Sequence, residues 1–330
     1  MRGPKTRPAR RLALVLALLV AVAFPASAGA LIVGVGDQQP YMFQDARFQA
    51  LGIHYSRLSI GWNILQSRPE ARALGRWLAS ARAAGVHPLI AFEHSWMRGR
   101  HRQLPSPAQF AAQFRRLHAR YPWVSEFAAW NEANYCGQPT CRHAPTVAAY
   151  YRQIRAACPT CTVLGAELLD EPSMVGWLRS FRHALRREPQ VWGLHNYLGA
   201  NRLRAGSTEA LLRATSAPVW FTETGGVVAR HGPHRHHGFP ESPSHAAKVT
   251  EFIFHRLARL SGRIARVYLY QWQAGSFPRE PWDSALIALD GKPRPAFSVL
   301  VRELHQLGQL PETAAARALL ASATRVLRSR

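Results

Sequence analysis

Eight short apolar segments alternate with longer amphipathic segments along most of the chain. The short segments are rich in β-branched and aromatic residues and have the length of buried strands. They cover residues 31–37, 55–62, 86–94, 124–134, 162–169, 191–198, 218–225 and 266–272. The longer segments carry apolar residues three or four positions apart and often end at Gly or Pro, which is typical of helices that pack on one face.

Strands that alternate with helices form parallel sheets with right-handed crossovers. Eight such repeats within one chain of 330 residues predict an α/β fold, a (β/α)8 TIM barrel. The rival is a doubly wound open sheet. It is disfavoured because the first strand segment, LIVGVGD, runs on into QQP instead of a glycine-rich turn that opens a helix.

The two ends of the chain differ from the barrel segment. Residues 1–28 combine a basic stretch, an apolar run and small residues, and they predict a signal peptide and a secreted, extracellular protein. The apolar run, Leu12 to Phe24, has 13 residues, whereas roughly 20 are needed to span a bilayer. We therefore expect no stable membrane anchor after cleavage. Residues 29–310 would form the barrel, and 311–330 a basic C-terminal helix or tail.

The charge of the chain is strongly positive, with a formal net charge of +23. Five of these charges lie in the predicted signal peptide, which leaves +18 for the rest. Most of the remaining basic residues are arginines scattered over predicted helices, and dispersed arginine is typical of a solvated surface. We expect no nucleic acid partner, and at most weak affinity for anionic cell-wall polymers.

The four cysteines form two local pairs, Cys136 with Cys141 and Cys158 with Cys161. Their spacing resembles that of a four-thiolate zinc site. However, the segment 146–157 between the pairs reads as a helix, which would hold them roughly 18 Å apart. Two disulfides, Cys136–Cys141 and Cys158–Cys161, are therefore favoured in an exported protein over zinc or free thiols.

A histidine-rich loop follows the seventh strand segment and carries His231, His234, His236 and His237. Histidine clusters can bind zinc or nickel. Here Gly and Pro interrupt any regular element that would fix the ligand geometry, which favours a solvated loop beside the substrate. We predict no metal and no cofactor.

Polar and aromatic side chains gather where the predicted strands end, which in a (β/α)8 barrel is the face that carries the active site. These residues are Arg57, His94, Asn131, Glu132, His195, Tyr197, Glu223 and Trp272. Two of them, Glu132 and Glu223, lie near the ends of strands four and seven and can face each other across the barrel. Such a pair is what the cleavage of a glycosidic bond requires.

The pair would divide the work between an acid and a nucleophile. An apolar surround would raise the pKa of Glu132, the general acid/base, while Arg57 and a Tyr197 hydrogen bond would keep Glu223 ionised as the nucleophile. Asn131 would hold the sugar 2-hydroxyl, and Trp272 would stack on a sugar face. His94 and His195 complete the predicted substrate-binding set.

The motifs WNEAN (130–134) and TETG (222–225) resemble the acid/base and nucleophile motifs of clan A glycoside hydrolases. The order of the other site residues resembles family 5 cellulase-like enzymes, and the WNEAN form is similar to that of family 39 β-xylosidases. This resemblance covers about residues 31–310. It implies a retaining mechanism through a covalent glycosyl-enzyme. Ala133 stands where these families often have Pro, which leaves the choice of family open.

The sequence thus predicts a secreted retaining glycoside hydrolase that cleaves O-glycosidic, β-type bonds in an oligo- or polysaccharide. A catalytically inactive carbohydrate-binding barrel at the cell wall is the alternative. A metal-dependent barrel hydrolase would carry His-x-His at the end of strand one, where this chain has VGVGDQQP. The sugar and its linkage depend on loop residues that no sequence rule reads.

Overall fold

The computed structural model describes residue 3 and residues 31–230, 238–275 and 282–329. The predicted signal peptide, apart from residue 3, and the histidine-rich loop at 231–237 lie outside the described residues. Within the described ranges, no helix is both long enough and apolar enough to cross a bilayer.

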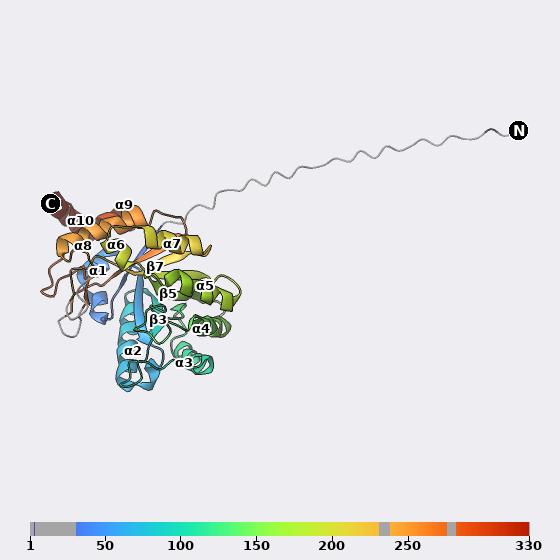
Figure 1. Ribbon diagram of the computed structural model, residues 1–330. Coiled ribbons are helices and arrows are strands. Elements are labelled where there is room, and N and C mark those ends of the chain that lie inside the picture. The colour runs from blue at the N-terminus through green and yellow to red at the C-terminus, as the bar shows by residue number, and fades with distance from the viewer. Residues whose placement is uncertain (1–2, 4–30, 231–237, 276–281, 330) are drawn as a thin grey trace.

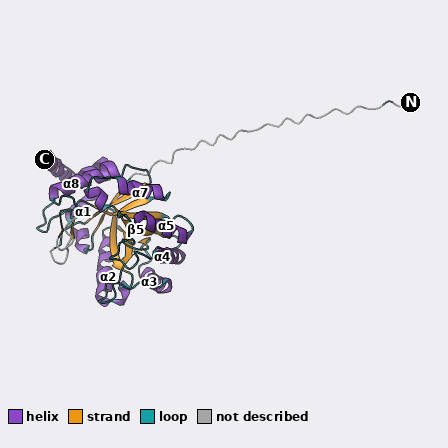
Figure 2. Ribbon diagram, viewed as in Figure 1, coloured by secondary structure: helices purple, strands orange, loops and turns teal. Residues whose placement is uncertain are grey.

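Eight parallel strands close into a barrel in the order β1-β2-β3-β4-β5-β6-β7-β9, which confirms the predicted fold class. Figure 2 shows these strands at the centre with the helices outside them. The strands are β1 (Ile32–Gly36), β2 (Tyr55–Gly61), β3 (His87–Glu93), β4 (Glu126–Ala128), β5 (Thr162–Leu169), β6 (Val191–His195), β7 (Val219–Thr224) and β9 (Ile264–Tyr270).

Helices and short helical turns connect the strands and cover the outside of the barrel (Figure 1). The α-helices are α1 (Ala46–Leu51), α2 (Arg68–Ala83), α3 (Pro107–Arg120), α4 (Ala144–Ala157), α5 (Met174–Leu185), α6 (Tyr197–Asn201), α7 (Gly206–Ala214), α8 (Pro243–Phe252), α9 (Pro295–Gln306) and α10 (Ala314–Arg328). Shorter helical turns are η1 (Pro40–Gln44), η2 (Ile64–Gln66) and η3 (Ile253–Leu257). Helix α10 lies within residues 311–330, for which the sequence predicts either a basic helix or a tail.

The helix α3 illustrates why these segments are helical. Ser106 caps its N-terminus: its hydroxyl accepts from the Gln109 amide, and the Gln109 side chain accepts from the Ser106 amide. This reciprocal pair satisfies two of the amides that a helix start leaves open. The side chains of Phe110, Phe114 and Leu117 then lie three or four residues apart and are buried. The helix therefore packs one apolar face on the barrel.

Two layers of apolar residues sit on either side of the barrel wall. The larger layer lies between the strands and the helices. The smaller layer fills the inside of the barrel and consists of Leu89, Ala91, Ala128, Leu164, Val191, Trp220 and Tyr268. Because side chains alternate along a strand, these inner residues also identify which later positions of each strand point into the barrel.

The fourth strand is shorter than the sequence predicted. The expected segment was 124–134, whereas β4 ends at Ala128 and residues 131–134 form turns. In this stretch the amide of Asn131 donates to the carbonyl of Phe92 (2.6 Å), and the amide of Ala133 donates to the carbonyl of Glu167 (2.9 Å). The chain thus stays anchored to both neighbouring strands while it leaves the regular ladder.

A small two-stranded sheet lies outside the barrel order. It pairs β8 (Ala229–Arg230) with β10 (Trp282–Asp283) in antiparallel orientation. The Trp282 ring packs edge-on against Tyr197, with centroids 4.9 Å apart. This sheet connects the segments that follow β7 and β9 on the side of the barrel where those strands end.

Both predicted disulfides are confirmed. Cys136 pairs with Cys141 in the connection after β4, and Cys158 pairs with Cys161 just before β5. The Cα atoms of the two pairs are 4.9 and 5.4 Å apart, within the normal range for disulfides. No cysteine is left free, so the zinc alternative is wrong for this set.

Candidate active site

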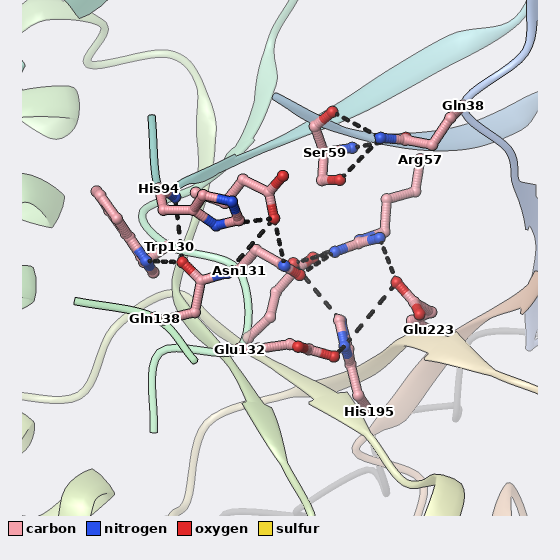
Figure 3. Close-up of polar contacts among 12 residues, drawn as sticks. Gln38, Arg57, Ser59, His94, Trp130, Asn131, Glu132, Gln138, His195 and Glu223 are labelled. Atoms are coloured by element: carbon pink, nitrogen blue, oxygen red, sulfur yellow. Dashed lines mark hydrogen bonds and ion pairs between the residues drawn. The ribbon is translucent and has the colours of Figure 1, made fainter. Parts of the chain in front are cut away.

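Arg57, on β2, connects most of the polar groups of the site (Figure 3). Its guanidinium donates to both carboxylate oxygens of Glu167 (2.8 and 2.5 Å), to Glu223 Oε2 (2.7 Å) and to Asn131 Oδ1 (2.6 Å). Burial lowers the pKa of Arg57, but Glu167, Glu223 and Glu132 outweigh it and raise the pKa overall. The arginine is therefore a permanent positive charge that holds two strand ends and the β4 turn together.

Glu132 adopts a backbone conformation that is rare for a residue with a side chain. Its φ is +46°, in the left-handed region that favours glycine. Hydrogen bonds of Asn131 and Ala133 to the neighbouring strands fix the chain on both sides of it. Such a conformation persists only where its surroundings enforce it, and it is most common at functional sites. The result is a carboxylate that points toward His195 (Figure 3).

The surroundings of Glu132 are more polar than the sequence predicted. Glu132 Oε1 lies 3.2 Å from His195 Nδ1, and 22% of the side chain is exposed. The expected apolar surround is therefore wrong. The acid lies against an imidazole instead.

His195 ends β6 and is completely buried. Burial lowers its pKa, but Glu223, Glu132 and Glu167 outweigh it and raise the pKa of His195 to about 9. Its Nδ1 faces Glu132 and lies 3.9 Å from Glu223 Oε2, while its Nε2 lies 3.6 Å from Glu167. At neutral pH the ring is consequently a second buried cation.

Glu223, near the end of β7, has three polar neighbours, namely Arg57, Tyr197 and His195. Arg57 donates to one of its oxygens and the Tyr197 hydroxyl donates to the other (3.2 Å). Burial raises the pKa of the Glu223 carboxyl, and the charges of Glu132 and Glu167 raise it further, while His195 and Arg57 act in the opposite direction. Burial and the carboxylates prevail, so Glu223 is ionised less readily than the sequence predicted.

Two carboxylates of the site, Glu167 and Glu93, are not among the residues predicted from the sequence. Glu167 on β5 is fully buried beneath Arg57, and although burial raises its pKa, Arg57 and His195 lower it to about 2. Glu93 ends β3; its Oε2 accepts from Asn131 Nδ2 (3.0 Å), and its Oε1 accepts from the Trp96 indole N–H. Burial and the charge of Glu132 raise the pKa of Glu93.

His94, predicted at the end of strand three, lies one residue beyond β3 and outside the central cluster. Its Nδ1 is 4.0 Å from Glu93 Oε2, and its amide donates to Gln138 Oε1 (3.1 Å). Leu89 and Ala91 point into the barrel, so Glu93 has the same inward phase and His94 does not. The alternation of inward and outward side chains along β3 would thus have identified Glu93 as a site residue.

Trp272 is not a site residue, which corrects the sequence prediction. Its side chain is 0% exposed and packs edge-on against Phe48 of α1 and Phe297 of α9. Its indole N–H donates to Asp45 Oδ2 (3.1 Å). The ring belongs to the layer between barrel and helices, so neither of its faces is open to a sugar.

A disulfide-closed loop supports the wall of the site. Gln138 lies between Cys136 and Cys141, and its Oε1 accepts from the Trp130 indole N–H (3.0 Å) as well as from the His94 amide. Its Nε2 lies 3.5 Å from Glu93 Oε2. Figure 3 shows Gln138 between Trp130 and His94. The loop therefore holds Trp130, which precedes Asn131 in the chain, and Glu93, which accepts from the Asn131 side chain.

Glu132, His195 and Glu223 offer one ligand atom each within 4.8 Å of one another, a spacing that a metal ion can use. However, Arg57 already contacts Glu223, and the raised pKa keeps His195 protonated, without a lone pair to donate. The residues therefore do not fit a metal. A second group, His118 with Cys158 and Cys161, has both sulfurs in a disulfide.

Comparison with protein-family models gives no match, and comparison with curated protein sequences also gives none. Solved structures, in contrast, match over most of the chain. A family 39 glycoside hydrolase from Bacteroides cellulosilyticus WH2 superposes with a TM-score of 0.56 at 16% identity, over 84% of this chain and 64% of that one. This chain thus spans somewhat less than two thirds of that structure.

Two further structures cover their own chains more fully. GH5_18 from Streptomyces cattleya, in complex with GlcNAc, gives a TM-score of 0.61 at 14% identity, over 87% of this chain and 82% of that one. Xylanase 10B from Thermotoga maritima gives 0.59 at 9% identity, over 84% and 95%. At these identities the likeness establishes the fold, and this chain has the (β/α)8 fold of these solved glycoside hydrolases.

Proposed function

We propose that the chain is a secreted retaining glycoside hydrolase that cleaves β-type O-glycosidic bonds in an oligo- or polysaccharide. One observation carries this proposal: a carboxylate oxygen of Glu132 and one of Glu223 lie within 4.8 Å of each other at the mouth of the barrel. Retaining enzymes hold their two carboxyl groups roughly 5–5.5 Å apart, whereas inverting enzymes need roughly 6.5–9.5 Å. The short spacing supports the retaining mechanism.

The reaction would proceed in two steps. In the first, Glu223 forms a bond to the anomeric carbon while Glu132 gives its proton to the leaving oxygen. In the second, Glu132 takes a proton from water, whose oxygen displaces Glu223 and restores the original configuration. Arg57 and Tyr197 contact the two Glu223 oxygens, so they hold the nucleophile in place and favour its ionised form.

Their hydrogen bonds support roles for Asn131 and His195 in substrate binding. The Asn131 amide uses its oxygen for Arg57 and one N–H for Glu93, which leaves a second N–H for a sugar hydroxyl. His195 carries a positive charge next to both candidate catalytic glutamates. It would offset their repulsion and orient Glu132 toward the substrate.

Secretion is supported by the two disulfides, because such bonds persist in oxidising compartments. The structural neighbours support a glycosidase: they include a family 39 glycoside hydrolase and a xylanase.

Azide rescue tests the assignment of roles. In Glu223→Ala, turnover should be lost, and azide should restore it with an inverted product, because the anion attacks once from the vacated side. In Glu132→Ala, the first step on aryl glycosides with good leaving groups should persist, and azide should give a retained product. Opposite stereochemistry in the two variants would mean that the roles are exchanged.

The rival function is a barrel that binds a glycan without cleaving it. Wild-type protein that binds a polysaccharide, yet hydrolyses neither aryl β-glycosides nor plant, fungal and bacterial polysaccharides, would support this rival. The presence of both carboxylates with Arg57 and Tyr197 in contact favours hydrolysis.

Affinity for anionic polymers would reside on another surface. An open depression of about 380 Å³ is lined by residues of α5 and the turn after it: Arg179, Arg182, His183, Arg186, Arg187 and Glu188. Four arginines around one depression favour a polyanion. If this surface binds a polyanion, cosedimentation of the protein with polygalacturonate should decrease as the salt concentration rises. It should also decrease in the variant Arg186→Glu.

A further inference from the structure

Exposed large apolar side chains concentrate on one face of the molecule. Within the described part of the chain they are Tyr41, Trp96, Tyr135, Leu203, Leu289 and Val326. The first five follow β1, β3, β4, β6 and β9, so they lie on the face where the barrel strands end and where the candidate catalytic residues lie. Only Val326, on α10, lies elsewhere. Exposed apolar residues that gather around a site indicate contact with a ligand.

Trp96 is exposed but fixed. Its side chain is 37% exposed, while its indole N–H donates to Glu93 Oε1. Beneath it lies Gly61, where an added Cβ would come within 3.5 Å of Trp96 Cγ. The polar edge of the ring is thus tied to a buried carboxylate, and the apolar surface remains open to solvent.

Tyr135 has a similar arrangement in the connection after β4. It is 43% exposed, and a Cβ on Gly137 would overlap its ring, so the ring lies directly against that glycine. Gly137 lies inside the Cys136–Cys141 ring, which limits the motion of this support. A residue of any other type at 137 would push the ring away.

The two aromatic residues belong to adjacent connections. The strands β3 and β4 pair in the barrel, and Gln138 bridges the two connections through the His94 amide and Glu93. The Gln138 amide in turn donates to the Tyr135 carbonyl (2.9 Å). Glu93, which holds Trp96, also contacts Asn131, the neighbour of Glu132. Trp96 is therefore linked to Asn131 through Glu93, and the backbone amide of Tyr135 donates directly to the carbonyl of Glu132 (2.9 Å).

We infer that Trp96 and Tyr135 form a platform for sugar units beyond the one whose bond is cleaved, so the substrate is a glycan chain and not a single terminal glycoside. This inference rests on the proposed function. Flat apolar rings suit the C–H faces of pyranose rings, and a platform held by a carboxylate and a disulfide loop pays little ordering entropy on binding.

The test compares two substrates of the same sugar. Wild type is screened on aryl monoglycosides and polysaccharides of xylose, mannose, glucose and N-acetylglucosamine, and the best pair is kept. In Trp96→Ala and in Tyr135→Ala, kcat/KM on the polysaccharide should fall roughly tenfold relative to kcat/KM on the monoglycoside. Trp96→Phe and Tyr135→Phe keep a ring and should keep most of that ratio. Val326→Ala is the matched control for an exposed apolar residue and should change neither value.

Binding provides a second readout that does not depend on turnover. In a Glu223→Ala background, titration calorimetry with xylo-, manno-, cello- and chitotetraose should detect one tetrasaccharide whose affinity falls with Trp96→Ala and Tyr135→Ala. If wild type hydrolyses nothing but this loss is seen, the proposed function fails while the platform stands. The platform is refuted if the alanine variants lower kcat/KM equally on both substrates or change it on neither. It is also refuted if no tetrasaccharide binds.

Discussion

Two arginines lie inside the barrel, and their partners differ. Arg266, near the start of β9, donates to Glu126 (2.6 Å) and to the Tyr268 hydroxyl (2.8 Å). Its guanidinium also packs 4.2 Å from the centroid of Tyr55 and 3.8 Å from that of Trp220. Arg57, on β2, instead contacts two carboxylates and an amide.

The difference indicates that the surroundings of Arg266 serve the stability of the barrel, whereas those of Arg57 suit acid/base chemistry. At Arg266 one acid balances one cation, and aromatic rings shield both, so the amino end of the barrel is a closed plug. Around Arg57 the carboxylates outnumber the cations: Glu167 and Glu223 touch it, while Glu132 and Glu93 lie nearby. Repelling carboxylates are what acid/base chemistry requires, and they raise the pKa values of Glu93 and Glu223.

The largest expected difference between the two ends of the barrel concerns removal of the two arginine charges, which should affect stability at both ends but activity only at the Arg57 end. Arg57→Met leaves Glu167 buried without its main partner, so we expect a loss of about 3–5 kcal/mol in the free energy of unfolding. It should also lower kcat by roughly 10²–10³-fold, because Glu223 loses a charged donor. Arg266→Met should lower stability but leave kcat unchanged in the folded protein. Denaturant unfolding and steady-state kinetics measure both.

A second substitution controls for misfolding. Arg57→Met combined with Glu167→Gln removes the orphaned charge and should recover part of the lost stability without recovering activity. If the double variant is active, or if Arg266→Met lowers kcat as much as Arg57→Met, the division between the two ends is wrong.

His195 should give the site its own pH dependence of stability. Its pKa is about 9 in the folded protein and about 6.5 when unfolded. Because the folded pKa is the higher one, its contribution is fully present below pH 6.5 and is lost as the pH rises through 9. We expect wild type to lose thermal stability over this window and His195→Gln to lose less. Equal slopes for the two proteins would contradict a buried charged imidazole.

The two disulfides sharpen the comparison at a smaller scale. Both close short loops, with sequence separations of 5 and 3, so removal of either should cost about 2 kcal/mol by chain entropy. Only the Cys136–Cys141 ring holds Gln138 against the site. Replacing both its cysteines by alanine should lower kcat/KM several-fold, whereas the same change at Cys158 and Cys161 should leave it unchanged. Equal kinetics would show that the ring does not position the site.

The sequence predicted the barrel because alternation of short and long apolar segments is a property of local residues. It also brought Arg57 and His195 to the site, since both keep the inward phase of their strands. Glu167 could not be found in this way: the β5–β6 register shifts between Leu164 and Glu167, and simple alternation points Ala166 inward instead.

The error at Trp272 has a different origin. The sequence placed it on the last barrel strand, whereas β9 ends at Tyr270, two residues earlier. Its orientation depends on residues far away, Phe48, Phe297 and Asp45, which bury the ring. The environment of Glu132 was misjudged for the same reason, because His195 lies 63 residues away in the chain. Long-range packing of this kind leaves no local pattern in the sequence.

The central claim is that Glu223 forms a covalent bond to the sugar with the help of Glu132. A 2-deoxy-2-fluoro glycoside of the preferred sugar, with a good leaving group, should form this bond and then hydrolyse slowly. Peptide mass mapping of the inactivated protein should place the fluorosugar on Glu223. A label on Glu132, or an unlabelled enzyme that releases an inverted product from the parent glycoside, would contradict the mechanism.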